Sequence, residues 1–217
     1  MNENAPTSAE IETGRKLFAR EWQFVAGAGS ADSMPPPYRF EIAFAGRSNA
    51  GKSSLLNALT GRNALARVSK TPGRTQQINF FTGGGDLVIA DLPGYGFASA
   101  PQKKIDQWNR LVREYLSGRK NLARVFVLVD ARHGLKPPDL EVFGLLDRAA
   151  VSYAVALTKI DTLKGGHESR VAETEAAIKK RPAAFPKVFP VSSLEGLGIA
   201  ELRGAIVRLM AERGAGL

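Results

Sequence analysis

The chain of 217 residues contains no cysteine and only two histidines. It can therefore form neither a disulfide bond nor a cysteine-based metal site. No uninterrupted apolar run is long enough to span a bilayer. The first four residues also lack the charged start and apolar core of a signal peptide. These absences are compatible with a cytoplasmic protein that has no membrane partner, which is what we expect.

Acidic residues are few relative to basic ones. The chain has 30 Lys and Arg against 21 Asp and Glu, which gives a net charge of +9. Such an excess favours polyanionic partners, chiefly nucleic acid. The alternative explanations are solubility and the positive charge that a nucleotide site itself needs. With 44% hydrophobic residues, the chain can bury a sizeable core, and its length suggests one domain with short extensions.

Strand and helix patterns alternate along most of the chain. We interpret residues 1–37 as an N-terminal extension, in which an amphipathic helix over 11–24 packs on the domain, and residues 38–217 as that domain. Helices are expected at 54–59, 101–118, 139–149, 168–180 and 199–212, and strands at 40–45, 77–81, 87–90, 125–129, 151–157 and 188–191. The pattern predicts an α/β fold: a mostly parallel six-stranded sheet with one antiparallel strand and helices on both faces.

The strongest motif follows the first predicted strand of the domain. Residues 46–53 match the P-loop pattern G-x-x-x-x-G-K-[ST], with a strand before and a helix after. Backbone N–H groups of such a loop and the start of the helix bind phosphate, the lysine reaches the β- and γ-phosphates, and the serine hydroxyl can ligate Mg²⁺. We therefore predict that phosphate is bound by Gly46, Arg47, Ser48, Asn49, Ala50, Gly51, Lys52 and Ser53.

A second motif, Asp91-Leu92-Pro93-Gly94, follows the strand at 87–90. A carboxylate at this strand end can hold Mg²⁺, and a glycine lets the backbone approach the γ-phosphate. An ordinary turn at the end of a strand is the alternative. Its position behind a P-loop and one hairpin favours the metal site.

A third motif, Thr158-Lys159-Ile160-Asp161, ends the strand at 151–157. The Asp161 carboxylate can accept two hydrogen bonds from the N1–H and the exocyclic amine of guanine, and adenine would leave it unpaired. The stem of Lys159 can lie over the purine. At the end of the last strand, the small residues Val191, Ser192 and Ser193 would let backbone N–H groups meet the guanine carbonyl, although a helix N-terminal turn explains them nearly as well.

The basic segment Lys70–Gln76 lies between the P-loop helix and the next strand. A loop that senses the γ-phosphate needs a hydroxyl that can reach Mg²⁺, and we favour Thr75 over Thr71. We extend the nucleotide-binding set to Gly73, Arg74, Thr75, Gln76 and Gln77. The predicted Mg²⁺ ligands are then Ser53, Thr75 and Asp91.

The amino-acid sequences of these motifs resemble those of the EngB (YihA/YsxC) family of bacterial GTPases in the Ras-like P-loop superfamily. Thr158, where many GTPases have asparagine, agrees with this family. The resemblance covers roughly residues 20 to 212 and implies a Ras-like fold and a cytoplasmic GTPase. It also implies a role in assembly of the large ribosomal subunit, with an associated role in cell division and septation. The implied partners are the subunit precursor and its rRNA; we expect no DNA partner and a monomer.

Tyr95 follows Gly94, where many Ras-like proteins place a glutamine that orients water. A phenol cannot do the same, so we expect slow intrinsic hydrolysis and an added stimulus. One candidate is K⁺ held by Asn49, as the resemblance to other K⁺-dependent assembly GTPases suggests; the other is the ribosomal particle. Asn49 could instead only stabilise the loop. The predicted catalytic set is Lys52, Thr75, Gly94 and Asn49.

Basic residues flank the motifs whose conformation is expected to change with the bound nucleotide. We expect them to bind rRNA phosphates in the GTP form. The alternative is that they form only a solvated charged face. They are Arg67, Lys70, Arg74, Lys103 and Lys104. Two other functions remain open from sequence. One is a P-loop kinase acting on a small molecule, and the other is a binding module with a vestigial nucleotide site.

Overall fold

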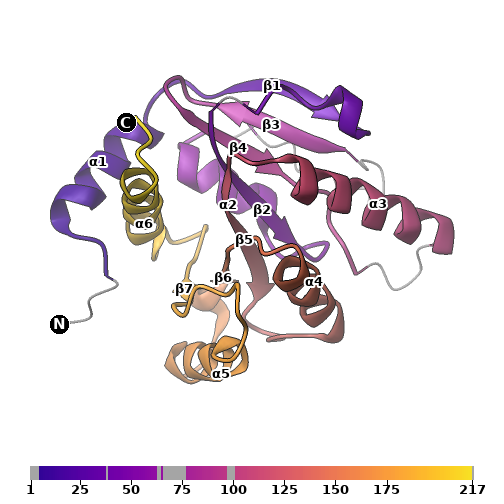
Figure 1. The fold of residues 1–217 in the computed structure, drawn as a ribbon. Coiled ribbons are helices and arrows are strands. Elements are labelled where there is room, and N and C mark those ends of the chain that lie inside the picture. The colour runs from indigo at the N-terminus through magenta and orange to yellow at the C-terminus, as the bar shows by residue number, and fades with distance from the viewer. Residues whose placement is uncertain (1–4, 38, 63–64, 66–76, 97–100, 217) are drawn as a thin grey trace.

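The structure is a computed structural model. It describes residues 5–37, 39–62, 65, 77–96 and 101–216, and the side chain of Lys104 is outside this description. Within these ranges the chain folds as one sheet with helices on both faces (Figure 1).

The sheet has seven strands in the order β1-β3-β4-β2-β5-β6-β7 among the described residues. β3 pairs antiparallel with both β1 and β4, whereas β4, β2, β5, β6 and β7 are mutually parallel. The α/β class and the antiparallel strand are confirmed, but the number of six strands is wrong by one. The strands are β1 (Gln23–Ala28), β2 (Phe40–Gly46), β3 (Ile78–Thr82), β4 (Leu87–Asp91), β5 (Leu122–Asp130), β6 (Tyr153–Thr158) and β7 (Phe189–Pro190).

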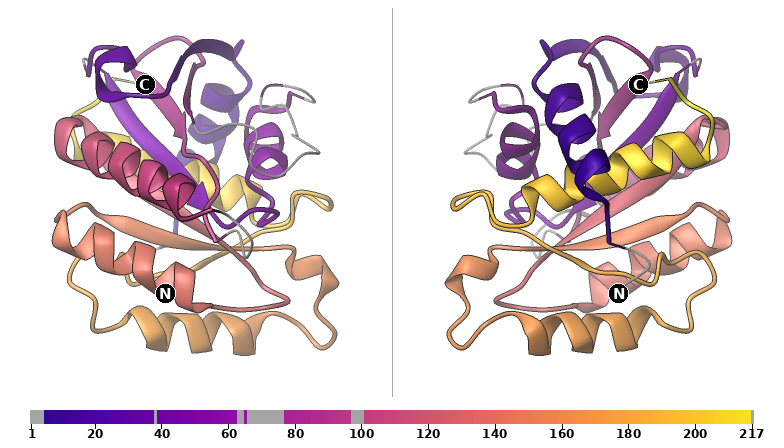
Figure 2. Two further views of the ribbon diagram at one scale, coloured as in Figure 1. Left: turned by 90° about the vertical axis from the view of Figure 1, so that its right-hand side faces the viewer. Right: turned by 90° about the vertical axis from the view of Figure 1, so that its left-hand side faces the viewer.

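Helices cover both faces of this sheet, as the two side views in Figure 2 show. One core lies between the sheet and α1, α2 and α6, and a second lies between the sheet and α3, α4 and α5. The inner strands β2 and β6 are buried at every position, and their sequences are mostly apolar, with Glu41 of β2 as the one charged residue in the two strands. The helices are α1 (Ser8–Phe18), α2 (Lys52–Thr60), α3 (Gln102–Gly118), α4 (Pro137–Arg148), α5 (Glu168–Ile178) and α6 (Ile199–Glu212), with short 3₁₀ turns η1 (Ala31–Ser33) and η2 (Ile160–Thr162).

The N-terminal segment is joined to this fold by a helix and a strand. The helix predicted over 11–24 is instead α1, which begins at Ser8 and ends at Phe18. It packs on α6, as Figure 1 also shows, and an ion pair of 2.7 Å joins Glu10 to Arg208. Phe24, which we placed in the helix, lies in β1 at the edge of the sheet and is exposed. The sheet therefore includes a strand from the predicted N-terminal extension. The predicted boundary between this extension and the domain, at residue 37, stays a prediction.

Candidate functional site

The P-loop connects the buried strand β2 to α2. Its path requires two residues in the left-handed region, Asn49 (φ 67°) and Gly51 (φ 91°). Asparagine is one of the few residues that tolerate this conformation without being glycine. The loop turns at a hydrogen bond of 2.9 Å from the Ala50 N–H to the Arg47 carbonyl. α2 then begins directly after the loop at Lys52, and its first N–H groups have no partner within the helix.

The P-loop and the second motif meet because β2 and β4 are parallel neighbours. Lys52, in the first turn of α2, makes an ion pair with Asp91 at the end of β4, and both side chains are largely buried. Ser53 follows Lys52 and is partly exposed. A carboxylate and a hydroxyl are hard oxygen donors that suit Mg²⁺. No group of three or more His, Cys, Asp or Glu forms a metal cage in the described ranges. These donors therefore fit an Mg²⁺ ion that takes further ligands from nucleotide phosphates and water.

The segment after Asp91 runs alongside the P-loop. The Ser48 N–H donates to the Tyr95 carbonyl at 3.1 Å, and the Tyr95 N–H donates to the Gly46 carbonyl at 3.3 Å. A Cβ added to Gly94 would lie 3.0 Å from the Ser48 hydroxyl oxygen. Gly94 therefore lies tightly against the P-loop, where a side chain would force Ser48 to shift. Its predicted approach to the γ-phosphate stays a prediction.

The third motif supports the same loop from the other side. The Thr158 hydroxyl donates to the Ala50 carbonyl at 2.6 Å, and Nζ of Lys159 donates to the Asn49 carbonyl at 2.7 Å. A Cβ on Gly51 would lie 3.7 Å from Cε of Lys159, so the lysine stem passes over the loop. These two hydrogen bonds thus join the strand end that is predicted to select the base to the loop that is predicted to bind phosphate.

The motif at Val191 lies next to the segment that is predicted to recognise the base. The Val191 N–H donates to the Leu157 carbonyl at 2.8 Å, which continues the pairing of β6 and β7. The buried Ser192 hydroxyl accepts from the Glu195 N–H at 3.1 Å, and the Ser192 N–H donates to the Leu197 carbonyl at 2.9 Å. Asp161 lies in η2, directly after Lys159 and Ile160. The two segments predicted to meet guanine therefore share one end of the sheet.

Comparison with known proteins identifies the family. The profile described as "50S ribosome-binding GTPase" matches residues 41–159, and that of the elongation factor Tu GTP-binding domain matches residues 111–212. A probable GTP-binding protein EngB of Bradyrhizobium diazoefficiens is 58% identical over 206 residues, covering 94% of this chain and 95% of its own. One of Afipia carboxidovorans is 53% identical over 221 residues, covering 97% and 99%. The chain belongs to the EngB family of P-loop GTPases.

Solved structures agree with this assignment. A crystal structure of a probable GTP-binding protein EngB has a TM-score of 0.65 and 26% identity, covering 80% of this chain and all of that one. A variant of Aquifex aeolicus Era bound to GDP.AlF4⁻ has a TM-score of 0.62 at 22% identity, covering 78% of this chain and 56% of its own, and shows the fold alone. As a member of the EngB family, the chain binds GTP and GDP and hydrolyses GTP.

The side chain of Tyr95 is directed away from the P-loop of this EngB-family protein. Its hydroxyl donates to Oδ1 of Asp139 in α4 at 2.8 Å, and its ring contacts Trp108 of α3 edge to face. The indole N–H of Trp108 donates to the Pro93 carbonyl at 2.8 Å. Burial, together with the charge of Asp139, raises the pKa of Tyr95 well above its usual value, so the phenol stays protonated. Tyr95 therefore positions the loop and does not face the phosphate site.

Sequence reasoning missed Asp130 and Arg132, at the end of β5. Nζ of Lys159 donates to Oδ2 of Asp130 at 2.8 Å, and Nη2 of Arg132 donates to the same oxygen at 2.7 Å. Burial would raise the pKa of Asp130, but the hydrogen bonds from Arg132 and Lys159 outweigh it and hold the pKa well below the usual range. The charge of Arg132 also faces Asp161. Asp130 could have been predicted from its position at the carboxyl end of a parallel strand, because ligands bind beyond these ends.

Several predicted site residues lie outside the described residues, and their roles stay predictions: Arg67, Lys70, Thr71, Gly73, Arg74, Thr75 and Gln76. The side chain of Gln77 lies against Gly27 of β1, and its contact with nucleotide also stays a prediction. Lys103 is exposed in the first turn of α3.

Proposed function

We propose that this GTPase acts as a switch in assembly of the large ribosomal subunit, with an associated role in normal cell division and septation. The observation that carries the proposal is the match of residues 41–159 to GTPases described as binding the 50S ribosome. This range contains the P-loop, the Asp91 motif and the first two residues of the base-recognition motif. The net charge of +9 supports an rRNA partner.

The site explains how GTP would be bound and cleaved. Lys52 would exchange its ion pair with Asp91 for the nucleotide phosphates, which frees the carboxylate to act on Mg²⁺ with Ser53. The N–H of Gly94 would donate to the γ-phosphate, since this residue lies against Ser48 of the P-loop. Mg²⁺, when bound, neutralises charge that develops on the phosphate oxygens. Loss of the γ-phosphate removes the contact with Gly94, and this is the difference that a partner can sense.

Hydrolysis is slow without a stimulus under this proposal, because the described residues place no side chain for orienting water at position 95. The stimulus is K⁺ or the ribosomal particle. Asn49 supports the first option: its side chain is exposed and makes no hydrogen bond to a described residue, while its carbonyl is taken by Lys159. An amide oxygen in this place is free to ligate a cation beside the phosphates.

Turnover measured in equimolar KCl and NaCl tests the stimulus. We expect K⁺ or added large-subunit particles to raise kcat at least about tenfold, as a cation placed at the transition state does. Asn49→Gly removes the amide and keeps the left-handed conformation. It should abolish the K⁺ effect and leave GDP affinity within about threefold. Equal rates in both salts, together with no response to the particles, would contradict the proposal.

Depletion of the protein in cells tests the assembly role. Sucrose-gradient profiles should then show large-subunit precursors accumulating while small subunits mature. A GTPase-deficient Lys52→Ala variant should fail to restore the profile, and the wild-type gene should restore it. Normal subunits after depletion would overturn the role. A septation defect that precedes any change in the profile would show that the division role is separate.

The alternatives have less support. A small-molecule kinase or a degenerate binding module does not account for the family assignment, nor for Lys52, Ser53, Asp91 and Asp161 all being in place. No helix in the described part of the chain is both long and apolar enough to cross a membrane. A cytoplasmic monomer that binds the ribosomal precursor, and neither DNA nor membrane, completes the proposal.

A further inference from the structure

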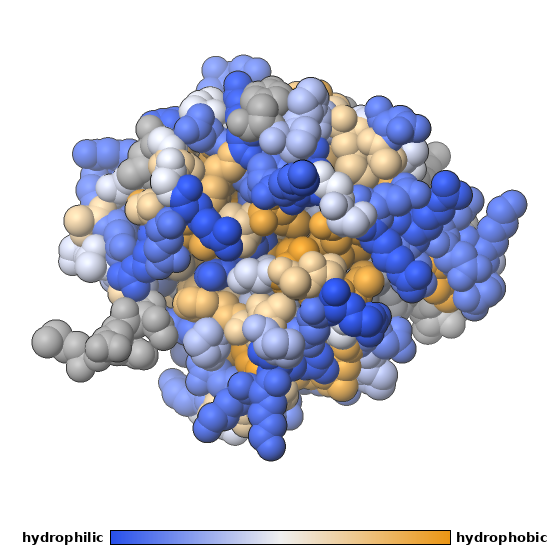
Figure 3. All heavy atoms as spheres, in the orientation of Figure 1, coloured by the Kyte–Doolittle hydropathy of each residue, from blue (hydrophilic) through white to orange (hydrophobic). Residues whose placement is uncertain are grey.

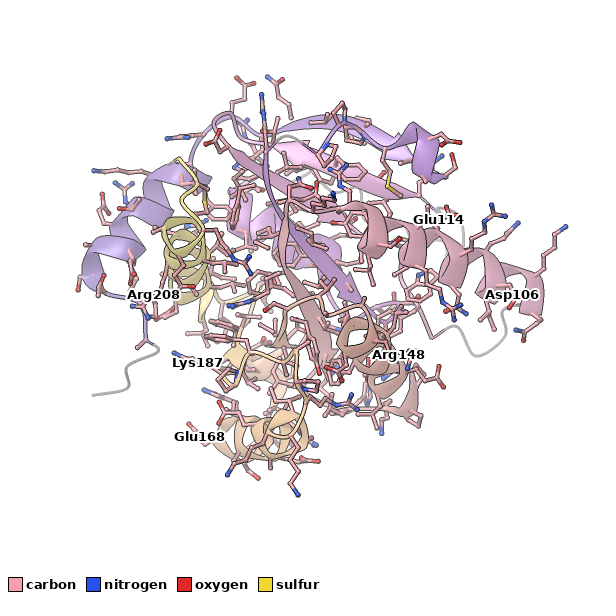
Figure 4. All side chains as sticks on the ribbon, in the orientation of Figure 1. Asp106, Glu114, Arg148, Glu168, Lys187 and Arg208 are labelled. Carbon is pink, nitrogen blue, oxygen red and sulfur yellow. The ribbon has the colours of Figure 1, made fainter. Side chains whose placement is uncertain are left out.

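A groove between α3 and α4 lies outside the nucleotide site. It is lined from α3 by Arg113, Glu114 and Ser117 and from α4 by Leu145 and Arg148. Figure 4 labels Glu114 and Arg148 on these two adjacent helices, and Figure 3 shows hydrophilic side chains gathered over α3 in the same view. The lining combines two arginines with the apolar side chains of Leu116, Leu145 and Ala149.

The charge of the groove is positive. Arg113 and Arg148 are exposed, and neither side chain makes an ion pair or a hydrogen bond with any residue in the described ranges. The one carboxylate of the lining, Glu114, already accepts a hydrogen bond of 2.8 Å from Arg110. Two guanidinium groups therefore remain available, and guanidinium forks match the geometry of phosphate oxygens.

Both walls of the groove are fixed to the rest of the domain. At the C-terminal end of α3, the Tyr115 hydroxyl donates to Oε1 of Glu41 at 2.7 Å, and Arg119 makes a buried ion pair with the same carboxylate. At the C-terminal end of α4, Asp147 pairs with Arg181 at 2.8 Å. The two free arginines stand beside these anchors, so their supports are pre-organised.

The anchors also separate the groove from the nucleotide. Glu41 lies near the start of β2, whereas Gly46 begins the P-loop at the end of this strand. Five residues of strand span about 16 Å. A change at the phosphate site reaches α3 first through Trp108 and Pro93, before the anchored half of the helix. The groove should therefore keep its shape in both nucleotide states.

We propose that the α3–α4 groove binds the phosphate backbone of large-subunit rRNA, and that this contact does not depend on the bound nucleotide. Arg113 and Arg148 contact phosphates, and the apolar strip with Leu145 packs against ribose or base. The inference rests on the proposed function, since it identifies a surface for the same RNA partner. Nucleotide dependence then comes from other contacts, such as those predicted for the basic residues near the switch segments.

Binding of protein-free large-subunit rRNA tests the groove. The variant is R113Q/R148Q, and its matched control is K179Q/K180Q, which removes two exposed charges at the end of α5. We expect the groove variant to bind about tenfold more weakly in both the GDP and the GTP-analogue forms. The slope of log K against log salt should shrink by about 1.5 to 2. The control should stay within about twofold of wild type, and fluorescent GTP should bind all three proteins equally.

Each of the other outcomes overturns one defined part of the proposal. Wild-type protein that binds neither the precursor nor its rRNA overturns the proposed function together with the groove. Two outcomes overturn the groove alone, provided that the wild-type protein binds rRNA. In one, both variants bind rRNA as tightly as the wild type; in the other, both variants lose the same affinity for rRNA. A loss confined to the GTP-analogue form overturns the independence from nucleotide. If R113Q/R148Q binds rRNA normally but no longer binds a ribosomal protein, the partner of the groove is a protein and not RNA.

Discussion

Thr158 joins two motifs that lie 108 positions apart in the sequence. Its hydroxyl donates to the Ala50 carbonyl, so the strand that ends in the predicted base-recognition motif holds the P-loop. Thr158→Ala leaves a buried carbonyl without this donor, which costs about 1–3 kcal/mol. We expect fluorescent GDP to dissociate about tenfold faster. Thr158→Ser keeps the hydroxyl and should restore the rate; equal rates for the Ala and Ser variants would refute this role.

Tyr95 offers a second test at the scale of one residue. Tyr95→Phe removes the donor to the buried Asp139 carboxylate but keeps the ring against Trp108. We expect the free energy of unfolding to fall by about 1–3 kcal/mol. Single-turnover hydrolysis should change by less than about threefold, because the hydroxyl faces α4. A hundredfold loss of hydrolysis at unchanged stability would place the phenol in the chemistry.

Residue positions within the motifs were predictable because each motif carries its own chemistry. Lys52 of the first motif pairs with Asp91 of the second, and Gly94 lies against Ser48 of the P-loop, so the two motifs adjoin. Their contacts with nucleotide and Mg²⁺ stay predictions. The pairing of Asp130 with Lys159 was not predictable, because it depends on β5 and β6 being neighbours and on side-chain direction. The same holds for the direction of Tyr95, which a helix more than 40 positions away determines.

Among the elements, α1 depends on a contact far away in the sequence. Hydrogen bonds from Arg208 of α6, opposed by partial burial, lower the pKa of Glu10 from 4.5 to about 2. A carboxyl whose folded-state pKa is lowered stabilises the fold above its unfolded pKa and loses this effect as pH falls. We therefore expect Glu10→Gln to cost about 1 kcal/mol at pH 7, since the pair is partly exposed.

The pH dependence identifies the source of that difference. Between pH 4.5 and pH 2, the gap in unfolding free energy between wild type and Glu10→Gln should narrow toward zero. Urea denaturation across this range measures it. Glu12→Gln on the exposed side of α1 is the control and should show no comparable loss at pH 7. A gap that stays constant with pH would show that the charge of the Glu10 carboxylate is not the source of the difference.

Element types were predictable where periodicity and length agreed, as in β5, α4 and α6. β1 was not predictable. Phe24 and Val25 fit an amphipathic helix or a strand, and local preference does not choose between them. The choice comes from β3, which has an unpaired edge that β1 covers.

At the scale of the whole molecule, alternation of strands and helices was sufficient to predict the α/β class. The extent of the folding unit was harder, because glycines and prolines between residues 26 and 37 look like a linker. The structure instead places α1 and β1 on two sides of the domain, with Leu17 and Phe18 buried against it. We infer that residues before 38 belong to the same cooperative unit.

Deletion of residues 1–19 tests this inference. It removes Leu17 and Phe18, whose exposed fractions are 3% and 0%, and uncovers the apolar side of α6 that they contact. Burial of each side chain contributes about 1.5–3 kcal/mol, so the loss is about 3–6 kcal/mol. For a chain of this size the melting temperature shifts by about 2–4 °C per kcal/mol, so we expect it to fall by about 6–24 °C. Full-length Glu12→Gln is the control, since its carboxylate is exposed and pairs only within α1. An unchanged melting temperature would show that the segment is an appendage and that the domain begins near residue 38.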